Sequence, residues 1–232
     1  MMAGQGSLQQ AFALLTGSDA ALWPIVWLSL QVSGLATLLA AICALPLAAW
    51  LALTPFPGRS AVVAVLNALM GLPAVVVGLL VYLLLSRAGP LGPMGLLFTP
   101  AAMVVAQTVL ILPLMTALSR QMLEDTLAEC GPYLRSLRAT RGQTIRTLLW
   151  EARFSLVTVL LAGFGRAAAE VGAVMMVGGN IQGVTRVMTT TIALETSKGD
   201  LPLALGLVLL STVLAVNAAA TAVRHHAQRR FG

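Results

Sequence analysis

The chain has 232 residues, of which 58% are hydrophobic and 9% are charged, whereas soluble domains average about 25% charged residues. This composition, with a mean hydropathy of +0.90, excludes a water-soluble core. Residues 20–58, 60–86, 88–119 and 201–223 contain no Asp, Glu, Lys or Arg. Each stretch exceeds the roughly 20 apolar residues that a helix needs to cross a bilayer. The sequence therefore predicts an all-α integral membrane protein.

Five transmembrane helices are expected in chain order, at residues 24–52, 61–86, 94–119, 154–177 and 201–223. No basic segment precedes the first apolar run, and the run is too long for a signal peptide, so we expect it to be a span. Segments rich in Pro and Gly at residues 54–58 and 87–93 separate the first three spans. The five spans are expected to form one domain, residues 1–232.

The net charge of +6 comes mostly from basic residues at the ends of the apolar runs. This placement indicates membrane topology and argues against nucleic-acid binding. Because the number of spans is odd, the termini face opposite sides. Three basic residues, Arg87, Arg186 and Lys198, fall on one side and ten on the other, namely Arg59, Arg120, Arg135, Arg138, Arg141, Arg146, Arg153, Arg224, Arg229 and Arg230. The positive-inside rule then predicts an outer N-terminus and a cytoplasmic C-terminus.

Signatures of metal sites and of enzymes are missing. Cys43 and Cys130 are far apart and have no metal-ligand spacing. The sequence lacks the Gly-x-x-x-x-Gly-Lys-Ser/Thr loop that binds nucleotide phosphates. We therefore expect no catalytic residue, metal or cofactor on this chain, and any ATP hydrolysis must come from another polypeptide.

The longest polar segment, residues 120–153, falls between the third and fourth spans on the expected cytoplasmic side. Gly131 and Pro132 are expected to divide it into an acidic and a basic part, and leucines recur among the arginines at near-helical spacing. Two interpretations remain open. The segment is a docking site for a protein partner, or a basic helix that lies on anionic membrane lipid.

This segment resembles the cytoplasmic coupling loop of bacterial ABC importer permeases, in which a Glu-Ala-Ala motif, a Gly and a Leu-Pro mark short helices that insert into the ATPase. Residues 137–145 fit the middle of that pattern. The Glu-Ala-Ala position reads Pro-Tyr-Leu at 132–134, the Gly position reads Arg138, and the Leu-Pro position reads Trp-Glu at 150–151. The resemblance implies that the residues coupled to the ATPase are Tyr133, Leu134, Arg135, Leu137, Arg138, Ala139, Thr140 and Arg141.

Residues 163–180 and 181–200 resemble the permeases of tungstate importers, as do residues 71–80 and 86–92. The related molybdate permeases share the outline, and the long 178–200 stretch favours tungstate over molybdate or sulfate. The resemblance implies a type I ABC permease fold in the bacterial inner membrane. It also implies three partners: a second copy of the chain, a cytoplasmic ATPase dimer that holds the ATP, and an extracytoplasmic oxyanion-binding protein.

Two ionisable residues, Arg166 and Glu170, fall inside the expected fourth span. A lone charge there costs several kcal/mol, but residues one helical turn apart share a face and can neutralise each other. Together with Gly172, this face either lines a translocation path or gate, or holds neighbouring helices together.

The outer end of the same span carries Gly178, Gly179 and Asn180. Their backbone and side-chain donors can meet a hydrated dianion, or the run is an ordinary helix stop. Beyond it, Thr185, Arg186 and Thr189 are candidate contacts for the anion or for the protein that delivers it, or they belong to a solvated loop.

Two other classes of function stay open at this stage. An ion-coupled secondary carrier needs titratable groups within the membrane, and only Glu170 qualifies. A membrane scaffold would use the arginine-rich segment to recruit a cytoplasmic partner without transport.

Overall fold

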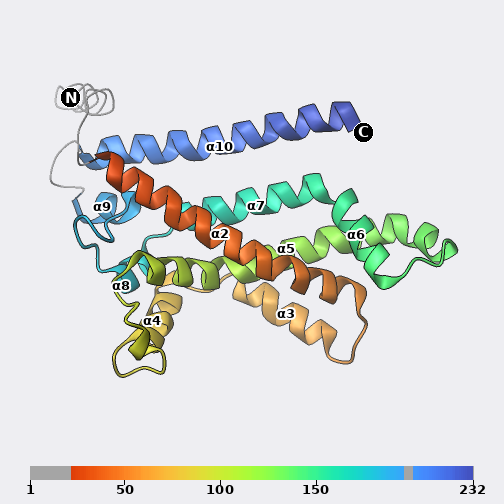
Figure 1. Cartoon of the computed structure of the whole chain (residues 1–232), viewed down its shortest axis with the longest axis horizontal. Helices are drawn as coiled ribbons and strands as arrows, with labels where there is room; N and C mark the ends of the chain where they lie inside the picture. The colour runs from red at the N-terminus through yellow and green to blue at the C-terminus, as the bar shows by residue number, and fades with distance from the viewer. Residues whose placement is uncertain (1–21, 196–200, 232) are drawn as a thin grey trace.

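The computed structural model describes residues 22–195 and 201–231. All regular structure in these ranges is helical (Figure 1): α2 (Leu22–Leu53), α3 (Arg59–Leu69), α4 (Ala74–Leu85), the 3-10 helix η1 (Gly92–Met94), α5 (Pro100–Ser136), α6 (Arg141–Glu151), α7 (Arg153–Ala168), α8 (Gly172–Gly178), α9 (Met188–Glu195) and α10 (Leu201–Phe231). The expected all-α class is confirmed.

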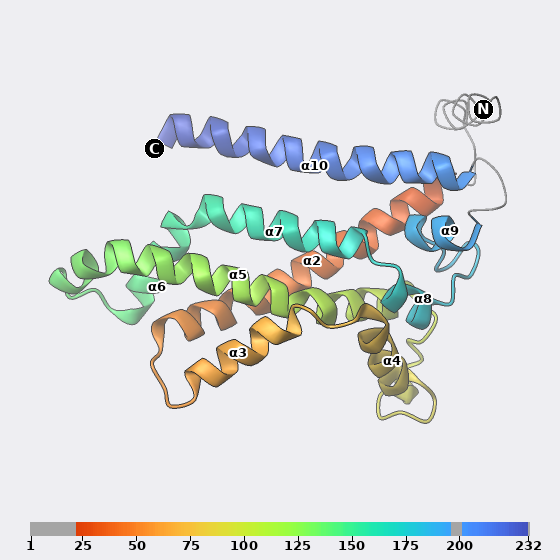
Figure 2. The same cartoon turned by 180° about the vertical axis from the view of Figure 1, so that it is seen from behind.

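The long helices lie along a common axis and connect two distinct ends of the molecule (Figures 1 and 2). The first is called the α6 end here and comprises residues 54–59 and 120–153. The second is called the α8 end and comprises residues 86–99 and 171–195. Helices α2, α5 and α10 run from the α8 end to the α6 end, and α7 runs back (Figure 2).

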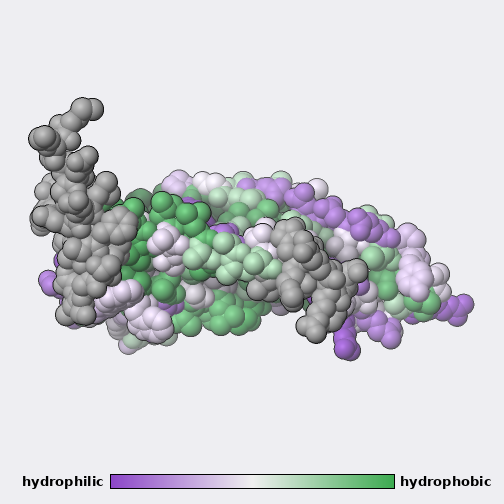
Figure 3. Space-filling model, turned by 90° about the horizontal axis from the view of Figure 1, so that it is seen from above, coloured by the Kyte–Doolittle hydropathy of each residue, from purple (hydrophilic) through white to green (hydrophobic). Residues whose placement is uncertain are grey.

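Three segments are long and apolar enough to cross a membrane alone: Leu22–Leu53, Pro100–Ser136 and Pro202–Ala219. Two pairs of consecutive helices, α3 with α4 and α6 with α7, add up to two more spans if each pair crosses as one bent unit. The described residues thus provide three to five spans. In Figure 3, hydrophobic residues cover much of the middle of the molecule, and many hydrophilic residues lie toward the α6 end.

The expectation that residues 61–86 form one helix is wrong. The chain breaks after Leu69, and α3 and α4 meet at an angle of 100°. The break contains Gly71 and Pro73. Proline has no backbone N–H and disfavours the helical conformation of the residue before it, so the helix that ends at Leu69 cannot continue through Leu72.

The third span also differs from the expected residues 94–119. Helix α5 starts at Pro100, where the Thr99 hydroxyl accepts a hydrogen bond from the N–H of Ala102 at 3.4 Å. It then continues to Ser136 without ending at residues 131–132. The ring of Pro132 removes the helical partner of the Ala128 carbonyl, but Ala128 is exposed, so water can hydrate that carbonyl once it lies beyond the bilayer. The helices of this segment therefore separate at residues 137–140, and Arg135 of the basic part lies in the last turn of α5.

Helix α2 packs along α5 through a row of small side chains. Ala36, Ala40, Ala44 and Ala48 are spaced four residues apart, and each is fully buried. Small residues at this spacing let two helix backbones approach closely, which is how helices associate in lipid. In contrast, the large residues Leu38 and Ile42 of α2 are exposed, as expected for a lipid-facing surface.

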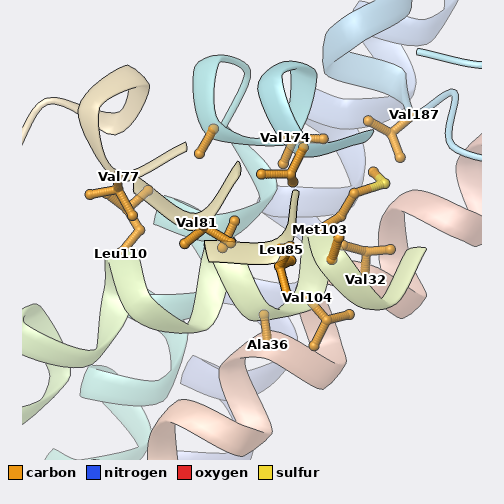
Figure 4. Close-up of a cluster of buried hydrophobic side chains, with 14 residues drawn as sticks. Val32, Ala36, Val77, Val81, Leu85, Met103, Val104, Leu110, Val174 and Val187 are labelled. Atoms are coloured by element: carbon orange, nitrogen blue, oxygen red, sulfur yellow. The ribbon is translucent and has the colours of Figure 1, made fainter. Parts of the chain in front are cut away.

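A cluster of buried hydrophobic side chains connects α8 to the long helices, as Figure 4 shows. It combines side chains of α2, α4, α5 and α8 with Val187, and its labelled members are Val32, Ala36, Val77, Val81, Leu85, Met103, Val104, Leu110, Val174 and Val187. Gly78 of α4 lies so close to α8 that a Cβ atom there would be 2.7 Å from the Ala173 Cα. The α4–α8 contact therefore requires a glycine at this position.

This contact can be tested with a matched pair of glycine substitutions. Gly34→Ala in α2 meets no atom within 4 Å, so it should be neutral or add about 0.5–1 kcal/mol of helix stability. Gly78→Ala brings the same helical preference but must push α4 from α8, at a cost of about 1–3 kcal/mol. Thermal unfolding of the purified proteins in detergent should show a lower midpoint for Gly78→Ala only. Equal midpoints would contradict the close approach.

Candidate functional site

The expected fourth span is interrupted at the position of its two ionisable residues. Residues 154–177 were expected to form one helix, but α7 ends at Ala168 and α8 begins at Gly172. Arg166 occupies the last turn of α7, and Glu170 lies in the junction between the two helices. The Glu170 carboxylate accepts a hydrogen bond from the N–H of Ala173 at 3.0 Å. A side chain that bonds the backbone three residues ahead favours a new helix start over a continuous helix.

Glu170 is the centre of this α7–α8 junction, and its side chain is only 3% exposed. One carboxylate oxygen accepts a hydrogen bond from Arg166 Nη1 at 2.8 Å, and the other is bonded to Ala173. Its backbone carbonyl accepts a hydrogen bond from the Thr189 hydroxyl of α9 at 2.8 Å. The expected ion pair is present. The backbone carbonyl of Glu170 also anchors α9 to the break.

A further residue of the junction, Gln107 of α5, was missed by the sequence reasoning. Its side-chain nitrogen donates a hydrogen bond to the Ala167 carbonyl in the last turn of α7 at 3.0 Å, and the residue is 3% exposed. The carbonyls of a last turn have no partner within their own helix, and the Ala167 carbonyl accepts from Gln107 in addition to the Glu170 N–H at 3.1 Å. A lone Gln inside an apolar span is itself a signal of such a role, because polar groups in lipid require partners.

The run Gly178, Gly179 and Asn180 forms the end of α8. Gly179 has a φ of 71°, and its N–H donates to the Met175 carbonyl at 3.0 Å, which closes the helix in the manner typical of glycine. Asn180 also takes a left-handed conformation, with a φ of 50°. Its side-chain oxygen accepts a hydrogen bond from the Thr190 hydroxyl at 2.8 Å.

The expected outer contact residues lie just beyond this turn, and two of them are buried. The Thr185 hydroxyl donates to the Gly178 carbonyl at 2.5 Å and accepts from the Ile181 N–H at 2.9 Å. Thr189 is 8% exposed and bonded to Glu170. Arg186 is half-buried between them. In this conformation the two threonine hydroxyls therefore serve the backbone of the broken span.

The expected ATPase-coupling residues surround a tight turn at the α6 end. Arg138, at the position where the resemblance places glycine, has a φ of 51°. The N–H groups of Arg138 and Ala139 donate to the carbonyls of Arg135 and Leu134, both at 3.0 Å. A left-handed residue after a helix is the usual place for glycine, so the conformation explains the glycine of the pattern, and here an arginine adopts it.

Helix α6 begins directly after this turn with a capping box. The Thr140 hydroxyl accepts from the Gln143 N–H, and the Gln143 side chain accepts from the Thr140 N–H at 2.8 Å. The spacing Thr-x-x-Gln is a sequence signal for a helix start. It was present in the sequence and fixes the boundary that the sequence analysis left undefined.

The side chains of the coupling segment divide into inner and outer ones. Leu134 is buried, whereas Tyr133 in the last turn of α5 and Leu137 directly after the helix are 68% and 61% exposed. Arg135, Arg138 and Arg141 are exposed as well. The segment thus presents two large apolar side chains among three cations, which is the composition of a protein-binding surface more than of a solvated loop.

An ion cluster that the sequence did not reveal holds the α6 end together. Glu124 of α5 pairs with Arg59 at the start of α3 and with Arg120 of its own helix, the latter at 2.5 Å. The Arg59 Nε also donates to the Leu51 carbonyl in the last turn of α2 at 2.8 Å. One arginine therefore connects three helices.

Groups that could hold a metal are not found in residues 22–195 and 201–231, where no three His, Cys, Asp or Glu side chains come together. Cys43 and Cys130 are free thiols. At the junction, the Glu170 carboxylate bonds to Arg166 and to the Ala173 N–H, while the side-chain oxygen of Gln107 is buried without a hydrogen-bond partner among the residues that the structure describes.

The junction makes a prediction about stability. Glu170→Ala removes both the ion pair and the acceptor for Ala173, and hydrogen bonds to charged groups contribute about 1.5–3 kcal/mol. Glu170→Gln keeps a neutral acceptor and should lose less. Thermal unfolding midpoints in detergent should therefore fall in the order wild type, Glu170→Gln, Glu170→Ala. Glu151→Ala, which removes an exposed carboxylate of α6, should match the wild type. A midpoint for Glu170→Ala equal to that of Glu151→Ala would contradict the role of Glu170.

No protein-family model matches the chain. Among curated proteins, it is 42% identical over 210 residues to the tungstate uptake system permease protein TupB of Peptoclostridium acidaminophilum, covering 90% of this chain and 92% of the relative. It is 40% identical over 215 residues to a probable anion ABC transporter permease protein of Haloferax volcanii, covering 90% and 93%.

A more distant relative is the molybdenum transport system permease protein ModB of Azotobacter vinelandii, which is 32% identical over 180 residues and covers 71% of this chain and 76% of the relative. The first two similarities each cover 90% of the chain. Together with the apolar helices, they show that the chain belongs to the ABC transporter permease family of the tungstate uptake proteins and is a multi-pass protein of the inner membrane.

Proposed function

We propose that the chain translocates tungstate across the inner membrane as the permease subunit of an ATP-driven importer. The observation that carries the proposal is the 42% identity to a tungstate uptake permease over 90% of the chain. The molybdenum permease is less similar, at 32% identity over 71% of the chain. Molybdate or sulfate is the second candidate, because these dianions have similar charge and hydrogen-bonding demand.

The α6 end is proposed to be cytoplasmic, with the N-terminus outside and the C-terminus inside. The arginines at positions 59 and 120–153 support this, since they gather at the end where α10 also finishes (Figure 1). Arg87 and Arg186 belong to the α8 end. This distribution follows the positive-inside rule.

Three protein partners follow from the function. A cytoplasmic ATPase dimer supplies ATP binding and hydrolysis, and it docks on the turn that carries Tyr133, Leu137 and Arg138. An extracytoplasmic oxyanion-binding protein delivers the anion to the α8 end. A second copy of the chain completes the path. This chain itself holds no cofactor in the proposal, and membrane lipid surrounds its apolar faces.

The translocation path is proposed to pass the α7–α8 junction. Arg166, Glu170 and Gly172 form its inner part, while the outer part contains Gly178, Gly179 and Asn180, with Arg186 nearby. The exposed fraction of 39% for the Arg166 side chain supports this choice, because its guanidinium can still meet an anion while it pairs with Glu170. Thr185 and Thr189 would reach the anion or its binding protein only after their present hydrogen bonds open.

The alternative of an ion-coupled carrier is less well supported. Such a carrier needs a carboxylate that can exchange its coupling ion. Both oxygens of Glu170 already accept hydrogen bonds, from Arg166 and from Ala173. A scaffold without transport gives no reason for a polar break inside a span, which is costly in lipid.

The docking surface can be tested with one substitution at each end of the molecule. Leu137→Asp places a charge in an exposed apolar contact, and the loss of one such anchor typically costs a complex about 2 kcal/mol or more. Recovery of the ATPase with the affinity-tagged permease should fall at least about tenfold. Leu91→Asp alters a comparably accessible leucine at the α8 end, which is 43% exposed, and should leave recovery unchanged. Equal recovery of the ATPase with both variants would contradict the docking site.

The substrate can be tested by uptake into vesicles that contain the permease, its ATPase and its binding protein. Uptake of labelled tungstate should require ATP and should resist excess molybdate or sulfate. Equal inhibition by molybdate would move the assignment to a shared oxyanion importer. Uptake that proceeds without ATP or without the ATPase would refute the ABC assignment.

A further inference from the structure

A groove separates the last part of α2 from α6 at the α6 end. Its cavity volume is about 420 Å³, within the range of about 300–1,000 Å³ that is usual for small-molecule sites. Its apolar wall comes from two helices and includes Leu45, Pro46, Ala49, Leu53, Ile145 and Leu149. The groove is separate from the α7–α8 junction and from the exposed Tyr133 and Leu137.

One cation belongs to the otherwise apolar lining. Arg141, the first residue of α6, is exposed and lines the groove together with Thr54. Within the described part of the chain, the Arg141 guanidinium makes neither an ion pair nor a hydrogen bond. Its neighbour on the next turn of α6, Arg146, is also exposed. The groove thus combines a long apolar wall with an unneutralised positive charge at one edge.

The depth of the groove is indicated by Trp50, which also lines it. Its ring stacks on Phe56 with a centroid distance of 4.9 Å, and the residue is 49% exposed. Half-exposed tryptophans mark the level where acyl chains meet polar headgroups. Leu45 and Pro46 lie one turn deeper in the charge-free α2 span, so the groove extends from the headgroup level toward the hydrocarbon.

We propose that this groove binds one anionic phospholipid, with an acyl chain along the α2 wall and the headgroup phosphate on Arg141. The positive charge of Arg141 favours this ligand, because basic pockets between transmembrane helices on the cytoplasmic side bind anionic headgroups. An apolar segment of a protein partner would leave Arg141 uncompensated. The site would join the membrane to α6, the helix that begins with the Thr140 capping box.

The proposal concerns a ligand other than the transported anion, and it holds for any oxyanion the permease carries. It does use the proposed cytoplasmic location of the α6 end. Failure of tungstate uptake would therefore leave it intact, whereas loss of lipid binding would leave the transport assignment intact.

Native mass spectrometry of the full chain in detergent, with added phosphatidylglycerol or phosphatidylcholine, provides the test. The wild type should retain phosphatidylglycerol in preference to phosphatidylcholine. Arg141→Gln should lower that preference about fivefold, equivalent to the roughly 1 kcal/mol that one basic residue contributes near an anionic surface. Arg135→Gln removes the same charge from the same end but does not line the groove, so it should keep the preference. Ala49→Leu fills the groove and should reduce retention of both lipids.

A second measurement detects the bound lipid by tryptophan fluorescence. Phosphatidylglycerol with brominated acyl chains should quench the fluorescence of the wild-type chain more than brominated phosphatidylcholine does, and Trp50→Phe should abolish this excess. Equal loss of lipid preference in Arg141→Gln and Arg135→Gln would overturn the proposal, since it would indicate general surface attraction. Normal lipid retention by Ala49→Leu with loss of the ATPase would also overturn it, because the groove would then be a protein contact.

Discussion

The bilayer interior offers no water to backbone groups, so each carbonyl or N–H that a broken helix releases there must find a partner within the protein. This constraint bears on the break between α7 and α8, inside the expected fourth span of residues 154–177. The Ala167 carbonyl accepts hydrogen bonds from the Glu170 N–H and from Gln107 of α5, and the Ala173 N–H donates to the Glu170 carboxylate. Thr189 then attaches α9 to the Glu170 carbonyl. The positions of α5, α7, α8 and α9 all depend on how this one interruption is satisfied.

Buried polar side chains of the junction and of the α8 end are likewise already bonded to the backbone. Glu170, Thr185 and Thr189 are buried, and each already bonds a main-chain group. Any conformation that frees them for an anion must replace these bonds at the same time. Any anion-binding role of these side chains is therefore coupled to the geometry of the helices, and a change in one requires a change in the other.

Apolarity along the sequence was sufficient for the membrane class and for approximate span positions, because it reports burial in lipid. It does not report whether a helix is continuous. The breaks at Leu72 and at Glu170 depend on Pro73 and on a single hydrogen bond to Ala173, while α5 passes through Pro132 because its end lies beyond the apolar region. The pairing of Arg166 with Glu170 follows from spacing alone. The contact of Gln107 with Ala167 joins residues 60 positions apart, which no local pattern encodes.

Helix α5 carries Gln107 at the junction and Glu124 in the ion cluster, and it ends at the turn of Arg138. Its 37 residues extend about 55 Å at 1.5 Å per residue. A rigid helix of that length that rotates about its middle moves both of its ends by similar distances. If it tilts about its middle by about 10°, its two ends move by about 5 Å in opposite directions. A small rotation applied at the α6 end would therefore displace the opposite end of α5 by a similar distance in the opposite direction.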